Sequence, residues 1–156
     1  MQLKPWLDPK GIAMNHANQL FADAVRIYPD FKDLFERFCA EMKRRLTENA
    51  QLPGVTVSPG QNGASVILQA LDRTFHISLD FLMPDGTPWG LLRVALLGEN
   101  KEPIQLFHLF FDHLGNVKET PHSSAAPHSL PSTDFVKRFL NRLTLEHFSR
   151  LSSNLK

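Results

Sequence analysis

Residues 73–97, RTFHISLDFLMPDGTPWGLLRVALL, contain two strand patterns joined by a turn. In the first half Phe75, Ile77 and Leu79 alternate with polar residues, which is the period of a strand with one buried face. Residues 84–87 supply the proline, aspartate and glycine of a tight turn. In the second half, Trp89 to Leu97, apolar residues fall on both sides of the alternation. The stretch therefore predicts a β-hairpin whose second strand has two apolar faces.

The strand pattern continues on both sides of this hairpin. Val55–Ser58 and Ser65–Leu71 are short strand patterns separated by Gln61-Asn62-Gly63, and Asn-Gly favours a hairpin because both residues tolerate positive φ. Ile104–Phe111 is a further strand pattern, also apolar on both sides, and a short sixth strand is expected near Val117. Because no helical pattern interrupts residues 55–118, we expect an antiparallel meander of five to six strands.

Helices are expected on both sides of the meander. Two N-terminal helices are predicted, over about residues 9–28 and 31–50, because Pro29 disfavours helical conformation at Tyr28. A C-terminal helix with a broad apolar face is predicted over about residues 132–152. The proline- and serine-rich residues 120–131 are expected to form a mobile linker. The prediction is a single α+β domain over residues 1–156, with two N-terminal helices, an antiparallel β-meander and one C-terminal helix packed on the sheet.

Composition excludes several classes of protein. The chain has 156 residues, 17 basic and 16 acidic side chains and one cysteine. Such a length can bury a core without disulfides or a structural metal, and Cys39, within an apolar stripe, is expected to be an inert packed thiol. The small excess of positive charge argues against nucleic-acid binding. Because no apolar run reaches ~20 residues and no apolar stretch follows Lys4, we expect neither a membrane span nor a secretory signal, and a cytoplasmic location.

The two-sided strands raise the question of what covers the second face of the sheet. Exposing even three such apolar side chains costs several kcal/mol at ~25 cal/mol per Å². We therefore expect that face to be covered, either by the C-terminal helix in a three-layer domain, by a second copy of the chain, or by a protein partner.

Strand register predicts which side chains share that second face. If Met83 pairs with Pro88, Ser78 lies opposite Arg93; if Leu97 pairs with Ile104, Arg93 lies opposite His108. A three-residue turn would shift the first register by one and bury the Arg93 guanidinium in the core, so we prefer the four-residue turn. The resulting candidate binding band comprises Asp80, Arg93, His108, His76, Trp89, Leu91 and Phe110.

Two functions follow from this band. The leading prediction is a non-enzymatic protein-binding module of the adaptor, chaperone-like or inhibitor/immunity-like kind, acting through an apolar sheet face on a protein partner or on itself as a homodimer. The alternative is a small-molecule-binding protein or an uncharacterised enzyme that uses the Asp80, Arg93 and His108 cluster. No catalytic residue, cofactor or metal site is predicted, because the seven histidines lack metal-ligand spacing and no phosphate-binding glycine motif is present.

Element order also suggests a resemblance to a known family. The sequence Phe38–Leu46, Val55–Ser58, Ser65–Leu71 and Phe75–Phe81 resembles the mitochondrial matrix acidic glycoprotein family, in which a helix leads into an antiparallel meander and helices close the chain. That family is strongly acidic, and this chain is not. Type III secretion chaperones are similar in being small α+β dimers, but they have a helix between strands. Neither resemblance assigns a role to any residue.

Overall fold

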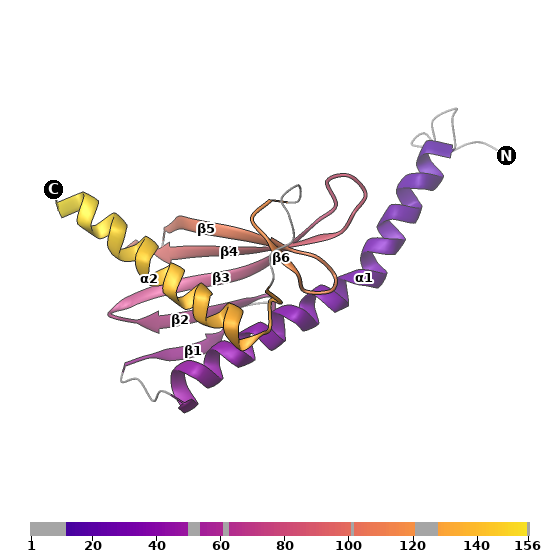
Figure 1. Cartoon of the computed structure of the whole chain (residues 1–156). Helices are drawn as coiled ribbons and strands as arrows, with labels where there is room; N and C mark the ends of the chain where they lie inside the picture. The colour runs from indigo at the N-terminus through magenta and orange to yellow at the C-terminus, as the bar shows by residue number, and fades with distance from the viewer. Residues whose placement is uncertain (1–11, 50–53, 61–62, 101, 121–127, 156) are drawn as a thin grey trace.

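The computed structural model describes residues 12–49, 54–60, 63–100, 102–120 and 128–155. Its strands form one antiparallel sheet in which every strand pairs with its sequence neighbours, so the predicted meander and α+β class are confirmed. Figure 1 shows a curled sheet with a helix at each end of the chain. The elements are α1 (Ile12–Lys43), the π-helical turn η1 (Arg44–Asn49), β1 (Thr56–Pro59), β2 (Ser65–Ala70), β3 (Arg73–Leu82), β4 (Trp89–Leu97), β5 (Pro103–Phe111), β6 (Val117–Lys118) and α2 (Thr133–Leu155).

The prediction of two N-terminal helices is wrong, because α1 continues through Pro29. A proline inside a helix removes one backbone hydrogen bond and costs about 3 kcal/mol. Aromatic packing on both sides of Pro29 offsets that cost: the Phe81 ring lies 5.6 Å from the Tyr28 ring and 5.3 Å from the Phe31 ring. Figure 1 shows that α1 changes direction between the part that lies on the sheet and the part that extends beyond it.

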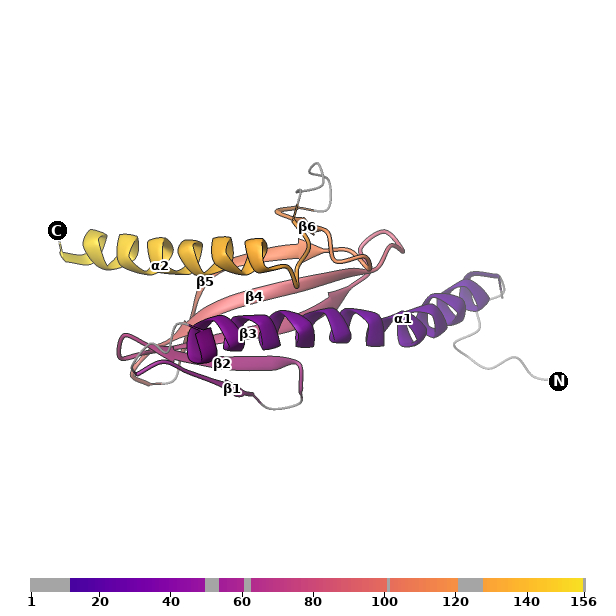
Figure 2. The same ribbon diagram turned by 60° about the horizontal axis from the view of Figure 1, so that its bottom comes forward.

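Both helices lie on the same face of the sheet, which we call the inner face (Figures 1 and 2). The Phe139 ring of α2 lies 5.0 Å from the Phe38 ring of α1 and 5.7 Å from the Phe107 ring of β5, so the three elements share one core. The C-terminal helix is therefore packed on the sheet as predicted. The three-layer arrangement is not observed, since neither described helix lies on the opposite, outer face.

The register of the central hairpin is the predicted one. Leu82 pairs with Trp89 and Ser78 with Arg93, which is the pairing that a four-residue turn over residues 84–87 requires. The next register is right only for the part nearest that turn, where Arg93 pairs with His108. A β-bulge then shifts the pairing, so that Leu97 lies opposite Pro103 instead of Ile104. The bulge allows Leu106 and Phe107, which are adjacent in the chain, both to be buried in the core.

The end of the predicted linker is attached to the sheet. The backbone N–H of Val117 donates to the carbonyl of His128, and the N–H of Leu130 donates to the carbonyl of Gly115. Leu130 is fully buried, which explains why residues 128–131 are held although their composition suggested mobility. Residues 121–127 of the predicted linker lie outside the described residues.

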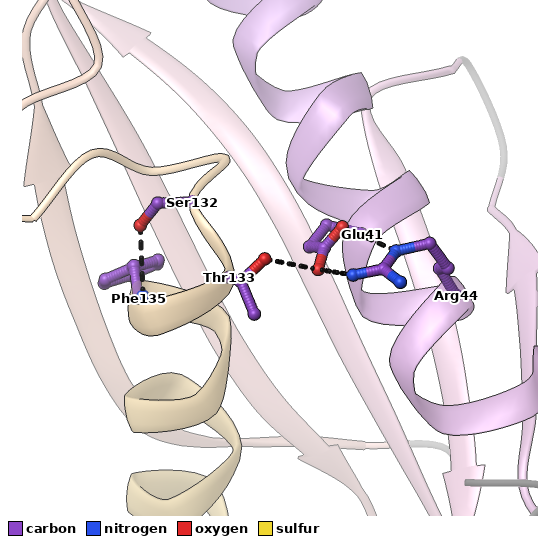
Figure 3. A network of polar contacts seen from close by, with 5 residues as sticks. All are labelled: Glu41, Arg44, Ser132, Thr133 and Phe135. Atoms are coloured by element: carbon purple, nitrogen blue, oxygen red, sulfur yellow. Dashed lines mark hydrogen bonds and ion pairs between the residues drawn. The ribbon is translucent and has the colours of Figure 1, made fainter. Parts of the chain in front are cut away.

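Polar contacts tie the start of α2 to α1, as Figure 3 shows. The Ser132 hydroxyl accepts a hydrogen bond from the Phe135 N–H at 3.1 Å, which caps the helix. The Thr133 hydroxyl donates to Glu41 Oε1 at 2.9 Å, and Arg44 Nε donates to Glu41 Oε2 at 3.0 Å. Hydrogen bonds from Arg44 and then Thr133 lower the pKa of the Glu41 carboxyl against the opposing effect of burial. Glu41 therefore joins the two helices as a carboxylate.

Candidate functional site

The predicted band lies on the outer face of β3, β4 and β5. In the register Ser78, Arg93 and His108 form one row across these strands. The next row contains Asp80, Leu91 and Phe110, and β6 extends it with Lys118. The structure thus brings together all seven residues of the band on one surface: Asp80, Arg93, His108, His76, Trp89, Leu91 and Phe110.

The polar centre of this surface is a cross-strand ion pair between Arg93 Nε and an Asp80 carboxylate oxygen. The two side chains are 43% and 45% exposed, so the pair faces solvent rather than the core. His108, opposite Arg93, is also exposed, and its ring lies 5.8 Å from the Phe110 ring in an edge-on arrangement. The centre therefore offers an imidazole and the remaining N–H donors of a guanidinium to an incoming group.

Two apolar residues of the outer face, Trp89 and Leu91, are buried without a covering helix. Trp89 is 8% exposed and Leu91 4% exposed, although no described helix covers them. The Trp89 ring packs edge-on against the Phe110 ring, with centroids 6.4 Å apart, and Lys118 Nζ lies 5.1 Å from the Trp89 centroid. Leu91 lies between Asp80 and Phe110 in the register. Long polar side chains cover apolar surface in this way while keeping their charges in water.

This burial changes the interpretation of the two-sided strands. The alternation of apolar residues in β4 and β5 predicts a separate layer or a partner over their second face. The structure shows that Trp89 and Leu91 are already removed from water within the single chain. The outer face therefore exposes polar and aromatic side chains, which lie over the buried Trp89 and Leu91.

A hollow of about 420 Å³ lies beside the band, at the β1–β2 turn and β3. His76 and Ser78 contribute to it, but its lining does not include Asp80, Arg93 or His108. The other lining residues are Gly60, Ala64, Ser65, Ile67 and Leu79. His76 therefore opens onto a hollow that Asp80, Arg93 and His108 do not line, which weakens the case for one small-molecule site that uses the whole cluster.

Two further findings concern the residues that the structure describes. Within them, no group of three or more His, Cys, Asp or Glu side chains is placed to hold a metal ion. The helices in the same part of the chain are not long and apolar enough to cross a membrane.

Comparison with known proteins finds no matching family model, no matching curated protein and no matching solved structure. Any assignment of function therefore depends on the geometry of the chain itself.

Sequence reasoning missed one member of the outer surface. Lys118 is positioned by the short pairing of β6 with β5, in which it lies opposite Phe110. The expected strand near Val117 could have indicated this position. The cation over the Trp89 ring was not predictable, because it depends on the length of β6 and the rotamer of a flexible side chain.

Replacing Asp80 with alanine is expected to lower the free energy of unfolding by at most ~1 kcal/mol, because half-exposed ion pairs contribute little. Urea denaturation of the wild type and the variant measures the difference. Asp33→Ala is the matched control, since Asp33 forms an exposed pair with Arg37 on α1 at 3.1 Å. A loss of several kcal/mol at Asp80 alone would mean that the outer face is covered, and would favour the small-molecule alternative.

Proposed function

We propose that this protein is a non-enzymatic protein-binding module whose partner docks on the outer face of β3, β4 and β5. The observation that carries the proposal is the association of Arg93, His108 and Phe110, above the buried Trp89 and Leu91, on a sheet face that neither described helix covers. Arginine and aromatic residues are enriched where protein interfaces concentrate their binding energy. Because these residues lie on paired strands, the surface is already formed before a partner arrives.

Charge indicates the chemistry of the partner. The surface carries the cations Arg93 and Lys118 against one carboxylate, Asp80. Arg93 Nε makes the ion pair with Asp80. The other N–H groups of the guanidinium can donate hydrogen bonds to a carboxylate of the partner. We therefore infer a partner that presents acidic side chains beside an apolar group.

The buried state of Trp89 and Leu91 indicates the kind of complex. A large bare apolar patch is typical of obligate interfaces, whereas this surface is polar over an apolar base. We therefore infer that the protein folds alone and binds its partner reversibly, as an adaptor, chaperone-like or inhibitor/immunity-like protein does. A homodimer through the same face is the second form of the proposal.

Site-specific photo-cross-linking tests this function in the cell that makes the protein. A photoreactive amino acid is placed at His108 or at Gln105, which is exposed and pairs with Ala95 on the same face. Arg37, exposed on α1 and remote from that face, is the control position. We expect the same cross-linked protein from both outer-face positions, none from position 37, and loss of the product when Arg93→Glu is added.

The outcomes separate the two forms of the proposal. A product containing another protein supports a hetero-partner, and a product of two copies, reproduced with the purified protein, supports the homodimer. Equal products from all three positions, or products from position 37 alone, would overturn the proposal. A product that persists unchanged with Arg93→Glu would overturn the role of the charged centre.

A further inference from the structure

A second concave site lies on the inner side of the molecule, between α1 and the β1–β2 hairpin. This hairpin cleft has a volume of about 290 Å³. Phe35, Val57 and Val66, each no more than 9% exposed, form its apolar part. The remaining lining residues are Glu36, Cys39, Ala40, Lys43, Ser58, Pro59, Gly63 and Ser65. The cleft is open because residues with small side chains, Ala40 and Gly63 among them, line both of its walls.

The charges around the cleft are arranged along one face of α1. Glu36 and Lys43 are seven residues apart, which places them two turns and roughly 10 Å apart on the same side of the helix. At the Glu36 end, Lys32 precedes Glu36 by one turn, and its Nζ lies near Gly63 of the cleft, 3.5 Å from where a Cβ would be, so this end carries a cation as well as a carboxylate. Lys43 supplies the positive charge at the other end of the cleft, two turns from Glu36.

The cleft floor carries no charge at neutral pH. Burial, with a smaller contribution from the negative charge of Glu36, raises the pKa of the Cys39 thiol to about 12. The thiol is therefore protonated and behaves as a small apolar group. The apolar residues of the cleft, Phe35, Val57 and Val66, lack packing partners on the side that faces the open space. A ligand of matching shape would supply those contacts.

We propose that the hairpin cleft binds a small apolar carboxylic acid, with its chain on Phe35, Val57 and Val66 and its carboxylate beside Lys43. The volume sets the size of the ligand: at ~30 Å³ for a water-sized group, 290 Å³ holds about ten non-hydrogen atoms. An eight-carbon acid has that number. The site is independent of the proposed partner surface, which is on the other face of the sheet.

Isothermal titration of the purified full-length protein with octanoate tests the proposal, with octylamine and octanol as ligands of the same chain length. We expect octanoate to bind most tightly. Lys43→Gln should weaken octanoate about 10-fold, as expected for loss of a hydrogen bond to a charged group, and should leave octanol unaffected. Lys137→Gln, an exposed lysine of α2 outside the cleft, is the matched control.

A second variant and a chemical probe locate the ligand. Ala40→Leu adds a side chain to the cleft wall and should abolish binding, with circular dichroism to show that the variant is folded. Cys39 is the single cysteine of the chain, so octanoate should slow its reaction with N-ethylmaleimide. Octanoate binding that survives Ala40→Leu, equal affinity for octylamine, or no heat and no protection at millimolar octanoate would each overturn the proposal.

Discussion

Phe38→Ala is expected to lower the free energy of unfolding by about 3–5 kcal/mol, the range for removing a buried aromatic ring. Phe38 is fully buried at the point where α1 and α2 meet. Its ring centroid lies 5.0 Å from that of Phe139 and 5.9 Å from that of Phe135, both on α2. Alanine would leave a cavity between the two helices that rigid strands beneath them cannot close. Urea denaturation followed by circular dichroism measures the loss.

Phe21→Ala is the matched control for this variant. Phe21 belongs to the same helix but is 72% exposed. Its replacement is expected to change stability by no more than about 0.5 kcal/mol. Equal effects of the two substitutions would contradict the assignment of Phe38 to the shared core.

Gly90→Ala is expected to destabilise the protein by about 2–3 kcal/mol, because a Cβ at this position would overlap a buried ring. The added atom would lie 2.3 Å from Phe111 Cζ, and Phe111 is itself fully buried. In the register Gly90 lies between Phe81 and Phe111, and the Phe31 ring of α1 contacts both of those rings. Because glycine has no side chain, position 90 leaves room for this aromatic cluster. The free energy of unfolding by urea is again the measurement.

A double-mutant cycle tests the cause of that loss. Phe111→Leu removes the ring atoms that the new Cβ would meet, so Gly90→Ala should cost much less in that background. Gly98→Ala is the control, since a Cβ there would lie 3.5 Å from the Glu102 carbonyl oxygen, an ordinary contact. If Gly90→Ala were as harmless as Gly98→Ala, the proposed packing at Gly90 would be wrong.

The candidate band was predictable because it depends only on the alternation of side chains along each strand and on the length of one turn. Once residues 84–87 are assigned to the turn, alternation places Asp80 and Arg93 on the same face, and they form an ion pair there. The hairpin cleft was not predictable in this way. It depends on how far α1 lies from β1 and β2, which no local pattern in either element specifies.

The bulge at Leu106 shows where parity reasoning ends. Strict alternation along β5 would place only one of two adjacent residues on the inner face. Leu106 and Phe107 are adjacent, yet both are buried in the core. The β-bulge makes this possible because it leaves one residue of β5 without a paired residue on β4. The position of Arg93 opposite His108 is unaffected, since it lies on the side of the bulge nearest the β3–β4 turn.

The amino-acid sequence by itself determined the strands, the meander order and the sharing of one face by Asp80, Arg93 and His108, because each follows from the two-residue period of a strand and from nearby turn residues. Only the tertiary structure decided that α1 continues through Pro29, that α2 packs beside α1, and that Trp89 and Leu91 are buried without a second layer. These outcomes depend on contacts between distant residues, such as Tyr28 with Phe81 and Lys118 with Trp89, whose energies outweigh local preference.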